Sequence, residues 1–138
     1  MQQQLDDPVF GPVIYSYTRA QAIADGVLVD VSEIAKEAGF RWAVALTAAA
    51  WSDCVEWTEE DSRRQTHQDA SGRLWDVLWM AGQALRGATE NAGELLFELL
   101  RVPRDGKSTE AVPTRLKLMS GPGDDGEPVL TILLPEED

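Results

Sequence analysis

A dense cluster of turn-forming residues near the end of the sequence separates two runs that favour β-strands. Residues 121–128 are Gly-Pro-Gly-Asp-Asp-Gly-Glu-Pro, and glycine, proline and aspartate at this density mark a connection between elements. The flanking runs at 115–119 and 129–134 are mostly apolar and predict strands. Together they predict an antiparallel hairpin, which any fold of this chain must accommodate.

Residues 94–102 are compatible with two structures. The run Glu-Leu-Leu-Phe-Glu-Leu-Leu-Arg is rich in helix formers, and a helix would align its glutamates along one side. The run is nevertheless short, follows Gly93 and stops before Pro103. We therefore favour a strand over 95–102, which joins the hairpin in a C-terminal antiparallel meander.

Shorter elements are expected in the first part of the chain, where Val13-Ile14-Tyr15 favours a short strand. Thr18 with Gln21 three positions later has the pattern of a capping box, and it predicts a short helix through residue 24 that ends at Gly26. A strand is predicted over 27–31. Ser32 is then the expected N-cap of a second short helix, which ends at Gly39.

Two longer helices are predicted in the middle of the chain. Residues 43–59 place an alanine-rich stripe on one side of a helix, and residues 74–88 show the same spacing. Between them, residues 59–73 have no apolar periodicity and predict a long loop. We therefore expect an α+β fold, in which two longer and two short helices pack on a small, largely antiparallel sheet. Residues 1–12 form a loose N-terminal leader, and 13–138 form a single domain.

The formal net charge of −12 restricts the partners that this chain can bind. Nucleic acids and anionic membranes attract basic surfaces, and the sequence has no basic run. We expect a protein partner with a basic, nucleic-acid-binding surface. The single cysteine, and the lack of a signal-peptide start or of a membrane-spanning apolar stretch, favour a cytoplasmic protein.

The candidate contact residues are carboxylates around the predicted 43–59 helix. Asp53, Glu56 and Glu60 fall on one side of it, continued by Glu59 and Asp61. Carboxylates one helical turn apart lie about 5.4 Å from each other along the axis, a separation comparable with that of backbone phosphates. Such a row suits a DNA mimic, although a plainly solvated helix face is the commoner origin of this pattern.

Aromatic residues provide a second candidate contact. Trp75 and Trp79 lie one turn apart on the predicted 74–88 helix, off its main apolar face and on the same side as Arg86. Tryptophan beside arginine is typical of interaction hot spots. The alternative, burial of both rings beneath the sheet and against Trp51, is the commoner arrangement. Trp42 and Trp57 present the same choice.

No catalytic or metal-binding pattern is found, and no cofactor is expected. His67 is the single histidine, and with Asp69 it offers an acid/base pair in the predicted loop. No nucleophile accompanies it in a known pattern, so an exposed loop histidine is the simpler interpretation. Cys54 falls on the apolar side of its helix, and Asp124-Asp125 fits a β-turn better than a calcium loop.

Several segments resemble a bacterial and phage family that is known only as a domain of unknown function, number 6573. They are Val-Ile-Tyr-Ser-Tyr-Thr-Arg-Ala-Gln-Ala-Ile-Ala-Asp-Gly-Val-Leu-Val-Asp-Val-Ser at 13–32, Gly-Arg-Leu-Trp-Asp-Val-Leu-Trp-Met-Ala at 72–81, Arg-Val-Pro-Arg-Asp-Gly at 101–106 and Gly-Pro-Gly-Asp-Asp-Gly-Glu-Pro-Val-Leu-Thr-Ile-Leu-Leu-Pro at 121–135. The resemblance implies a setting on plasmids, integrative elements and prophages, where proteins that blunt host defence are common. It implies no catalytic residues.

These observations lead to one main hypothesis and two alternatives. The main hypothesis is an acidic, non-enzymatic inhibitor of a nucleic-acid-handling host defence complex, of the anti-CRISPR or antirestriction kind. The first alternative is a small enzyme or modifier that uses the 59–73 loop. The second is an accessory protein that pairs with another product of the mobile element.

Overall fold

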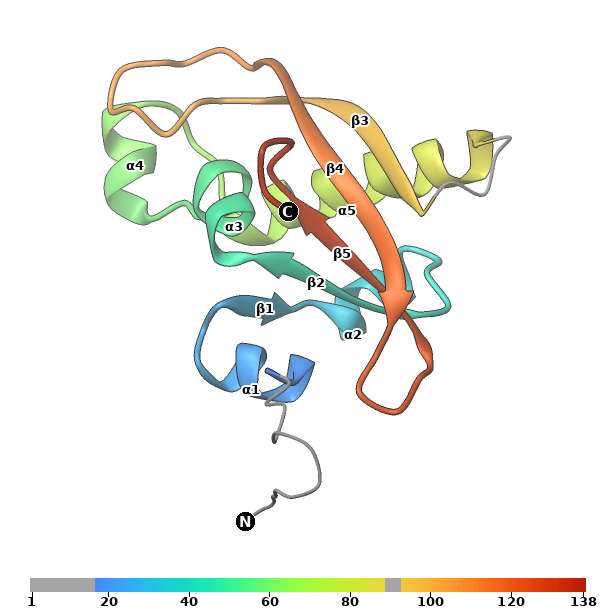
Figure 1. Ribbon diagram of the computed structural model, residues 1–138. Helices are drawn as coiled ribbons and strands as arrows, with labels where there is room; N and C mark the ends of the chain where they lie inside the picture. Colours follow the sequence, from blue (N-terminus) through green and yellow to red (C-terminus); the bar gives the residue numbers. More distant parts are fainter. Residues whose placement is uncertain (1–16, 89–92) are drawn as a thin grey trace.

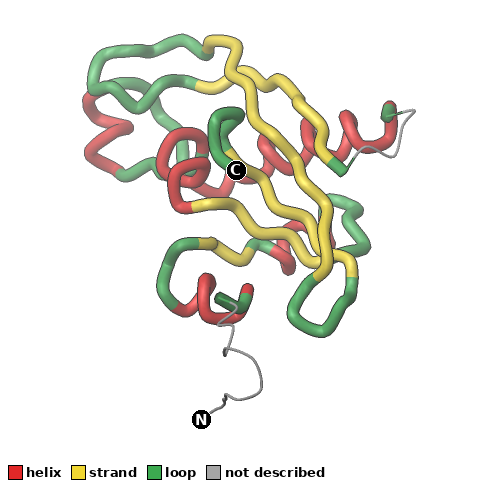
Figure 2. The backbone as a smooth tube through the Cα atoms, viewed as in Figure 1, coloured by secondary structure: helices red, strands yellow, loops and turns green. Residues whose placement is uncertain are grey.

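A computed structural model describes residues 17–88 and 93–138 of the chain. Five helices and five strands occur in these residues (Figures 1 and 2). In chain order they are α1 (Arg19–Ala24), β1 (Leu28–Asp30), α2 (Ser32–Glu37), β2 (Ala43–Thr47), α3 (Ala48–Cys54), α4 (Glu59–Arg64), α5 (Ala70–Gly87), β3 (Glu94–Arg101), β4 (Val112–Pro122) and β5 (Pro128–Leu133).

The strands form one five-stranded sheet in the order β1-β2-β5-β4-β3. The hairpin between β4 and β5 pairs Lys117 with Leu133, and β3 adds to β4 in antiparallel register. β5 also pairs with β2, with Val44 opposite Leu130, and this is the one parallel pair among the described strands. The predicted α+β fold with a largely antiparallel sheet and a C-terminal meander is confirmed.

The core lies between one face of the sheet and the helices α2, α3 and α5. α5 runs behind the sheet in Figure 1, and its Val77, Leu78 and Ala81 are fully buried against that face. Alternate residues of β3 point to this core, as Phe97 and Leu99 are also buried there. The even-numbered residues of β3 therefore point to the other face of the sheet, here called the open face.

Part of the open face is covered by α1 and by the turn after β5. Arg19 of α1 donates to Thr131 Oγ1 at 2.8 Å and to the carbonyl of Leu130 at 2.7 Å. The Thr47 hydroxyl donates to Glu137 Oε1 at 2.7 Å, and Lys117 Nζ donates to the Glu137 carbonyl. These contacts cover β2 and β5, and they leave β3 exposed on this face.

The short N-terminal elements follow the predictions closely. The Thr18 side chain accepts from the Gln21 amide and completes the predicted capping box of α1. Gly26 and Gly39 take positive φ angles of 79° and 103° just after α1 and α2, a conformation that glycine adopts without strain. Ser32 is the first residue of α2 rather than its N-cap, since Val31 occupies that place. The predicted leader 1–12 and strand 13–15 lie outside the described residues.

The helix predicted over 43–59 is wrong. Its first part is the strand β2, which is paired on both sides, and the helical residues in this range are Ala48–Cys54 of α3 and Glu59, where α4 begins. A central strand buried on both faces is a continuous apolar run, and periodicity alone does not distinguish such a run from a buried helix. The boundary between β2 and α3 lies at Thr47, whose hydroxyl accepts a hydrogen bond from the Ala50 amide at 3.1 Å and caps α3.

The long loop predicted over 59–73 is also wrong. Residues 59–64 form α4, and α5 begins at Ala70, so the link between these helices is short. α4 has no buried residue, and its sequence therefore lacks apolar periodicity. Its start is fixed by a capping box between Thr58 and Asp61.

Candidate interaction site

The five carboxylates predicted as a contact row belong to three different segments. Asp53 lies in α3, Glu56 lies in the link that follows it, and Glu59, Glu60 and Asp61 form the first turn of α4. Since the chain leaves the helix after residue 54, the predicted helical row does not form.

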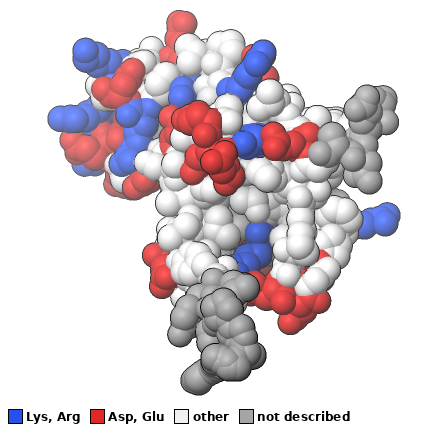
Figure 3. All heavy atoms as spheres, in the orientation of Figure 1, with Lys and Arg blue, Asp and Glu red and all other residues white. Residues whose placement is uncertain are grey.

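These carboxylates are also paired with arginines. Asp53 lies 3.1 Å from Arg101, and Arg104 bridges Glu56 at 3.4 Å and Asp61 at 2.7 Å. On α4, Glu60 pairs with Arg63 at 2.8 Å and Arg64 at 3.3 Å, and Glu59 lies 4.0 Å from Arg63. Figure 3 shows the two signs of charge intermixed over α4. Five acids against four arginines make this group nearly neutral.

The contacts of Asp61 show that this group of carboxylates and arginines has a structural role. Its carboxylate accepts from the Thr58 amide at 2.7 Å, as the second half of the capping box, and from Arg104 Nε at 2.7 Å. These hydrogen bonds lower the pKa of the Asp61 carboxyl, the Thr58 amide contributing most. The side-chain amide of Gln65 donates hydrogen bonds to the carbonyls of Pro103 and Ser108, both at 2.7 Å. The group thus joins α4 to the segment after β3.

Several carboxylates with no lysine or arginine nitrogen within 4.0 Å in the described residues lie on the open face and its margins, where Arg115 of β4 is opposite Glu98 in register. Glu94 and Glu98 point to this face from β3, the turn after β5 packs over it, and the hairpin loop between β4 and β5 borders it at α1. Figure 3 shows acidic side chains around the C-terminus and over the hairpin loop. We call this surface the acidic sheet face; its exposed acids are Glu94, Glu98, Asp125, Glu127, Glu136 and Asp138.

Two leucines alternate with the glutamates of β3. Leu96 is 53% exposed and Leu100 is 63% exposed. β3 is an edge strand, paired with β4 alone within residues 17–88 and 93–138, so its outer backbone groups are free to pair with an added strand. If residues 94–100 are taken as a strand, their pattern Glu-x-Leu-x-Glu-x-Leu predicts that glutamates and leucines alternate on one face. This pattern is the sequence signal that could have revealed the surface.

Trp75 and Trp79 lie on α5, on the side that faces away from the sheet. They are 39% and 45% exposed, and the Arg86 guanidinium lies 5.9 Å from the centre of the Trp79 ring. The alternative of burial beneath the sheet is therefore wrong for both. Trp42 is also exposed, whereas Trp57 is buried against Arg73.

The two residues suggested for acid/base chemistry lie near each other before and at the start of α5, where both line the same surface hollow. His67 is exposed in the link before α5, and Asp69 is the N-cap of α5, where its carboxylate accepts from the Gly72 amide at 2.7 Å. Cys54 is buried on the apolar side of α3, as predicted, and burial raises its pKa to about 12. The Asp124 carboxylate accepts from the amides of Arg19 and Ala20 and so caps α1.

Neither a metal cluster nor a membrane span is found in the part of the chain that the structure describes. No group of three or more His, Cys, Asp or Glu side chains there is arranged to hold an ion. None of the described helices combines the length and the apolar character that crossing a bilayer requires.

The family of unknown function DUF6573 has a sequence model that matches residues 10–138. The chain belongs to this family. Comparison with curated proteins and with solved structures gave no match. In its described residues, this DUF6573 member has a mixed five-stranded sheet with β5 at its centre and α5 packed on one face.

Proposed function

We propose that this protein is a non-enzymatic inhibitor that binds a basic, nucleic-acid-binding surface of a host defence complex, of the anti-CRISPR or antirestriction kind. The observation that carries the proposal is the acidic sheet face, where exposed carboxylates alternate with exposed leucines on an edge strand. The setting on mobile elements that the family resemblance implies supplies the class of target.

The chemistry of this surface suits a basic protein better than any other partner. Glu94 and Glu98 would face cations of the target, and Leu96 and Leu100 would be buried between them on binding. Charges at the rim of an interface mainly accelerate association, whereas buried apolar groups slow dissociation. The excess negative charge of the whole chain adds long-range attraction toward a cationic groove.

The acids of α4 provide a matched control. Glu59 and Glu60 are exposed carboxylates on the same molecule, but each lies beside an arginine of its own helix. Changing them to glutamine removes the same formal charge as changing Glu94 and Glu98. If the acidic sheet face binds the target, the two double variants should differ in their affinity for it. If net charge alone matters, their affinities should be equal.

The first experiment is a phage-plating assay in hosts that carry defined restriction or CRISPR systems. Expression of the wild-type protein should restore plating in one of these hosts. The purified target complex is then immobilised, and binding is measured in competition with duplex DNA. Glu94→Gln/Glu98→Gln should weaken binding about tenfold, Leu96→Ser/Leu100→Ser should weaken it at least as much, and Glu59→Gln/Glu60→Gln should leave it unchanged.

Several results would contradict the proposal. If expression of the protein restores plating in none of these hosts, the inhibitor function is contradicted. If all folded variants bind the target equally well, the acidic sheet face has no role in binding. Binding without displacement of DNA would exclude a basic groove as the target. Exclusive association with a protein encoded next to this gene would favour the accessory role instead. Circular dichroism of each variant distinguishes lost binding from lost folding.

A further inference from the structure

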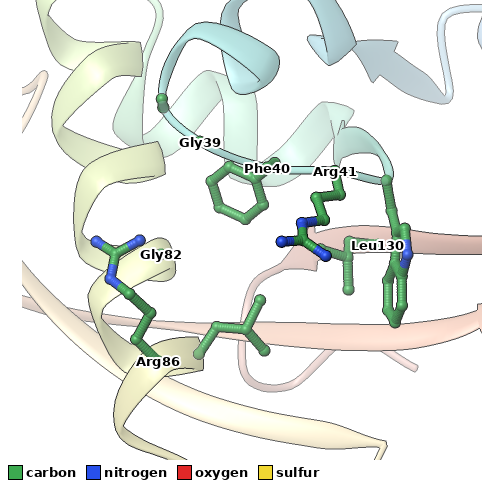
Figure 4. Close-up of a pocket in the computed structure, with 9 residues that line it drawn as sticks. Gly39, Phe40, Arg41, Gly82, Arg86 and Leu130 are labelled. Carbon is green, nitrogen blue, oxygen red and sulfur yellow. The ribbon is translucent and has the colours of Figure 1, made fainter.

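A second surface has the opposite charge and lies at the other side of the sheet. A pocket of 360 Å³ lies between the loop after α2, the last turns of α5 and Leu130 of β5. Phe40, Trp42 and Leu85 line it, together with the two arginines Arg41 and Arg86 (Figure 4). Most of its lining is apolar, and its volume falls in the range of about 300–1,000 Å³ that is typical of small-molecule sites.

The shape of the pocket depends on two glycines. Gly39 takes its positive φ angle at the end of α2 and turns the chain, so that the Phe40 amide donates to the Ala35 carbonyl at 2.9 Å. Phe40 is thereby buried beside α5. At Gly82 an added Cβ would lie 3.7 Å from both the Phe40 ring and Arg86 Nη1, so the bare backbone of Gly82 keeps the side of the pocket open.

The two arginines give the pocket a positive potential. Figure 4 shows the Phe40 ring between them in this view, with the Arg41 guanidinium pointing into the pocket. Within residues 17–88 and 93–138, neither guanidinium lies within 4.0 Å of a carboxylate. A guanidinium presents a planar fork of donors that matches carboxylate and phosphate oxygens.

We infer that this pocket binds a small aromatic anion, a planar ring that bears a phosphate or carboxylate group. The ring would pack against Phe40, Trp42 and Leu85, and the anionic group would accept hydrogen bonds from Arg41 and Arg86. A neutral ring would make no hydrogen bond to either guanidinium, and a bare inorganic anion would leave the apolar wall exposed to water. Binding therefore requires both parts of the ligand.

The test uses the full-length protein and isothermal titration calorimetry at low salt. Four probes are compared: 1-naphthyl phosphate, 1-naphthoate, neutral 1-naphthol and inorganic phosphate. The two aromatic anions should bind at least about tenfold more tightly than 1-naphthol and inorganic phosphate, which are the two controls. A higher salt concentration should weaken the binding of both aromatic anions. Adenosine monophosphate and 4-hydroxyphenylacetate then distinguish nucleotides from aromatic acids as the natural source.

Paired variants assign the binding to this pocket. Arg41→Gln and Arg86→Gln should each lower affinity for 1-naphthyl phosphate about tenfold, whereas Arg115→Gln, on the exposed part of β4, should not. Gly82→Met places a side chain in the pocket, and Gly87→Met is its control on the same helix, where a Cβ meets nothing within 4 Å. Thermal melting confirms that each variant is folded.

The proposal is overturned if neither aromatic anion binds at millimolar concentration. It is also overturned if the two controls bind as tightly as the aromatic anions, or if binding survives both arginine changes and Gly82→Met in folded protein.

Discussion

Arg73 is the side chain whose loss should destabilise this fold most clearly among its charged residues. It is 4% exposed, near the start of α5. Its guanidinium donates to the Val55 carbonyl at 3.1 Å, the Val102 carbonyl at 3.0 Å and Gln68 Oε1 at 2.9 Å. It also lies 4.5 Å from the centre of the Trp57 ring. One side chain thus joins α3, α5 and the end of β3.

The cost of Arg73→Met follows from these contacts. Methionine keeps most of the apolar stem but leaves the two buried carbonyls without their donor, at about 1–3 kcal/mol each. Loss of the cation–π contact adds about 1 kcal/mol, and relief from burying a charge offsets about 1 kcal/mol. The free energy of unfolding should therefore fall by about 3 kcal/mol, a large part of the 5–15 kcal/mol that is usual for a domain.

Urea unfolding followed by circular dichroism measures this loss. For an m-value of about 2 kcal/mol per molar urea, the midpoint should fall by about 1.5 M. Arg64→Met is the control, because that arginine is largely exposed and its ion pair with Glu60 should contribute less than about 1 kcal/mol. A loss below about 1 kcal/mol for Arg73→Met, or full stability in Arg73→Lys, would refute the reasoning, since lysine cannot reproduce the fork of donors.

Three further predictions follow from local contacts. Hydrogen bonds from the Ser108 hydroxyl and from the Ser108 and Lys107 amides lower the pKa of Asp105 to about 2. The stability that it adds is therefore present above about pH 4 and is lost as pH falls toward 2, and Asp105→Asn should reduce the pH dependence of the urea midpoint over that interval. The Cys54 thiol, with a pKa of about 12, should react with a disulfide reagent only at the rate of unfolding, and rapid modification of native protein would contradict its burial. Thr58→Ala should lower stability by about 1 kcal/mol and speed amide exchange in α4, because the capping box is lost; unchanged exchange would show that α4 does not depend on its cap.

The parts of the fold that were predictable share strong local signals. The turn cluster at 121–128 fixed the hairpin, and the Thr18–Gln21 pair marked the start of α1. The same logic applied at Thr58 and Asp61, but an aspartate in place of glutamate or glutamine made that capping box harder to recognise. β2 had no local signal of this kind, because alanine-rich strands and helices look alike when both are buried.

The candidate site was less predictable because its chemistry depends on distant partners. Asp53 meets Arg101, 48 positions away, and Asp61 meets Arg104, 43 positions away. Nothing within the 53–61 segment indicates that these carboxylates would be paired. The exposure of Trp75 and Trp79 likewise follows from which side of α5 faces the sheet, and that was settled by the apolar stripe at Leu74, Val77 and Leu78.

The central position of β5 has a consequence for the order in which this protein folds during synthesis. β5 comes after the other four described strands in chain order, yet it lies between β2 and β4 and connects the two halves of the sheet. Until residues 128–133 leave the ribosome, β2 and β4 lack the neighbour that joins them. The β1–β2 pair and the β3–β4 pair would then be two separate ribbons with exposed edges. A nascent chain of this protein is therefore most vulnerable to aggregation just before its last strand emerges.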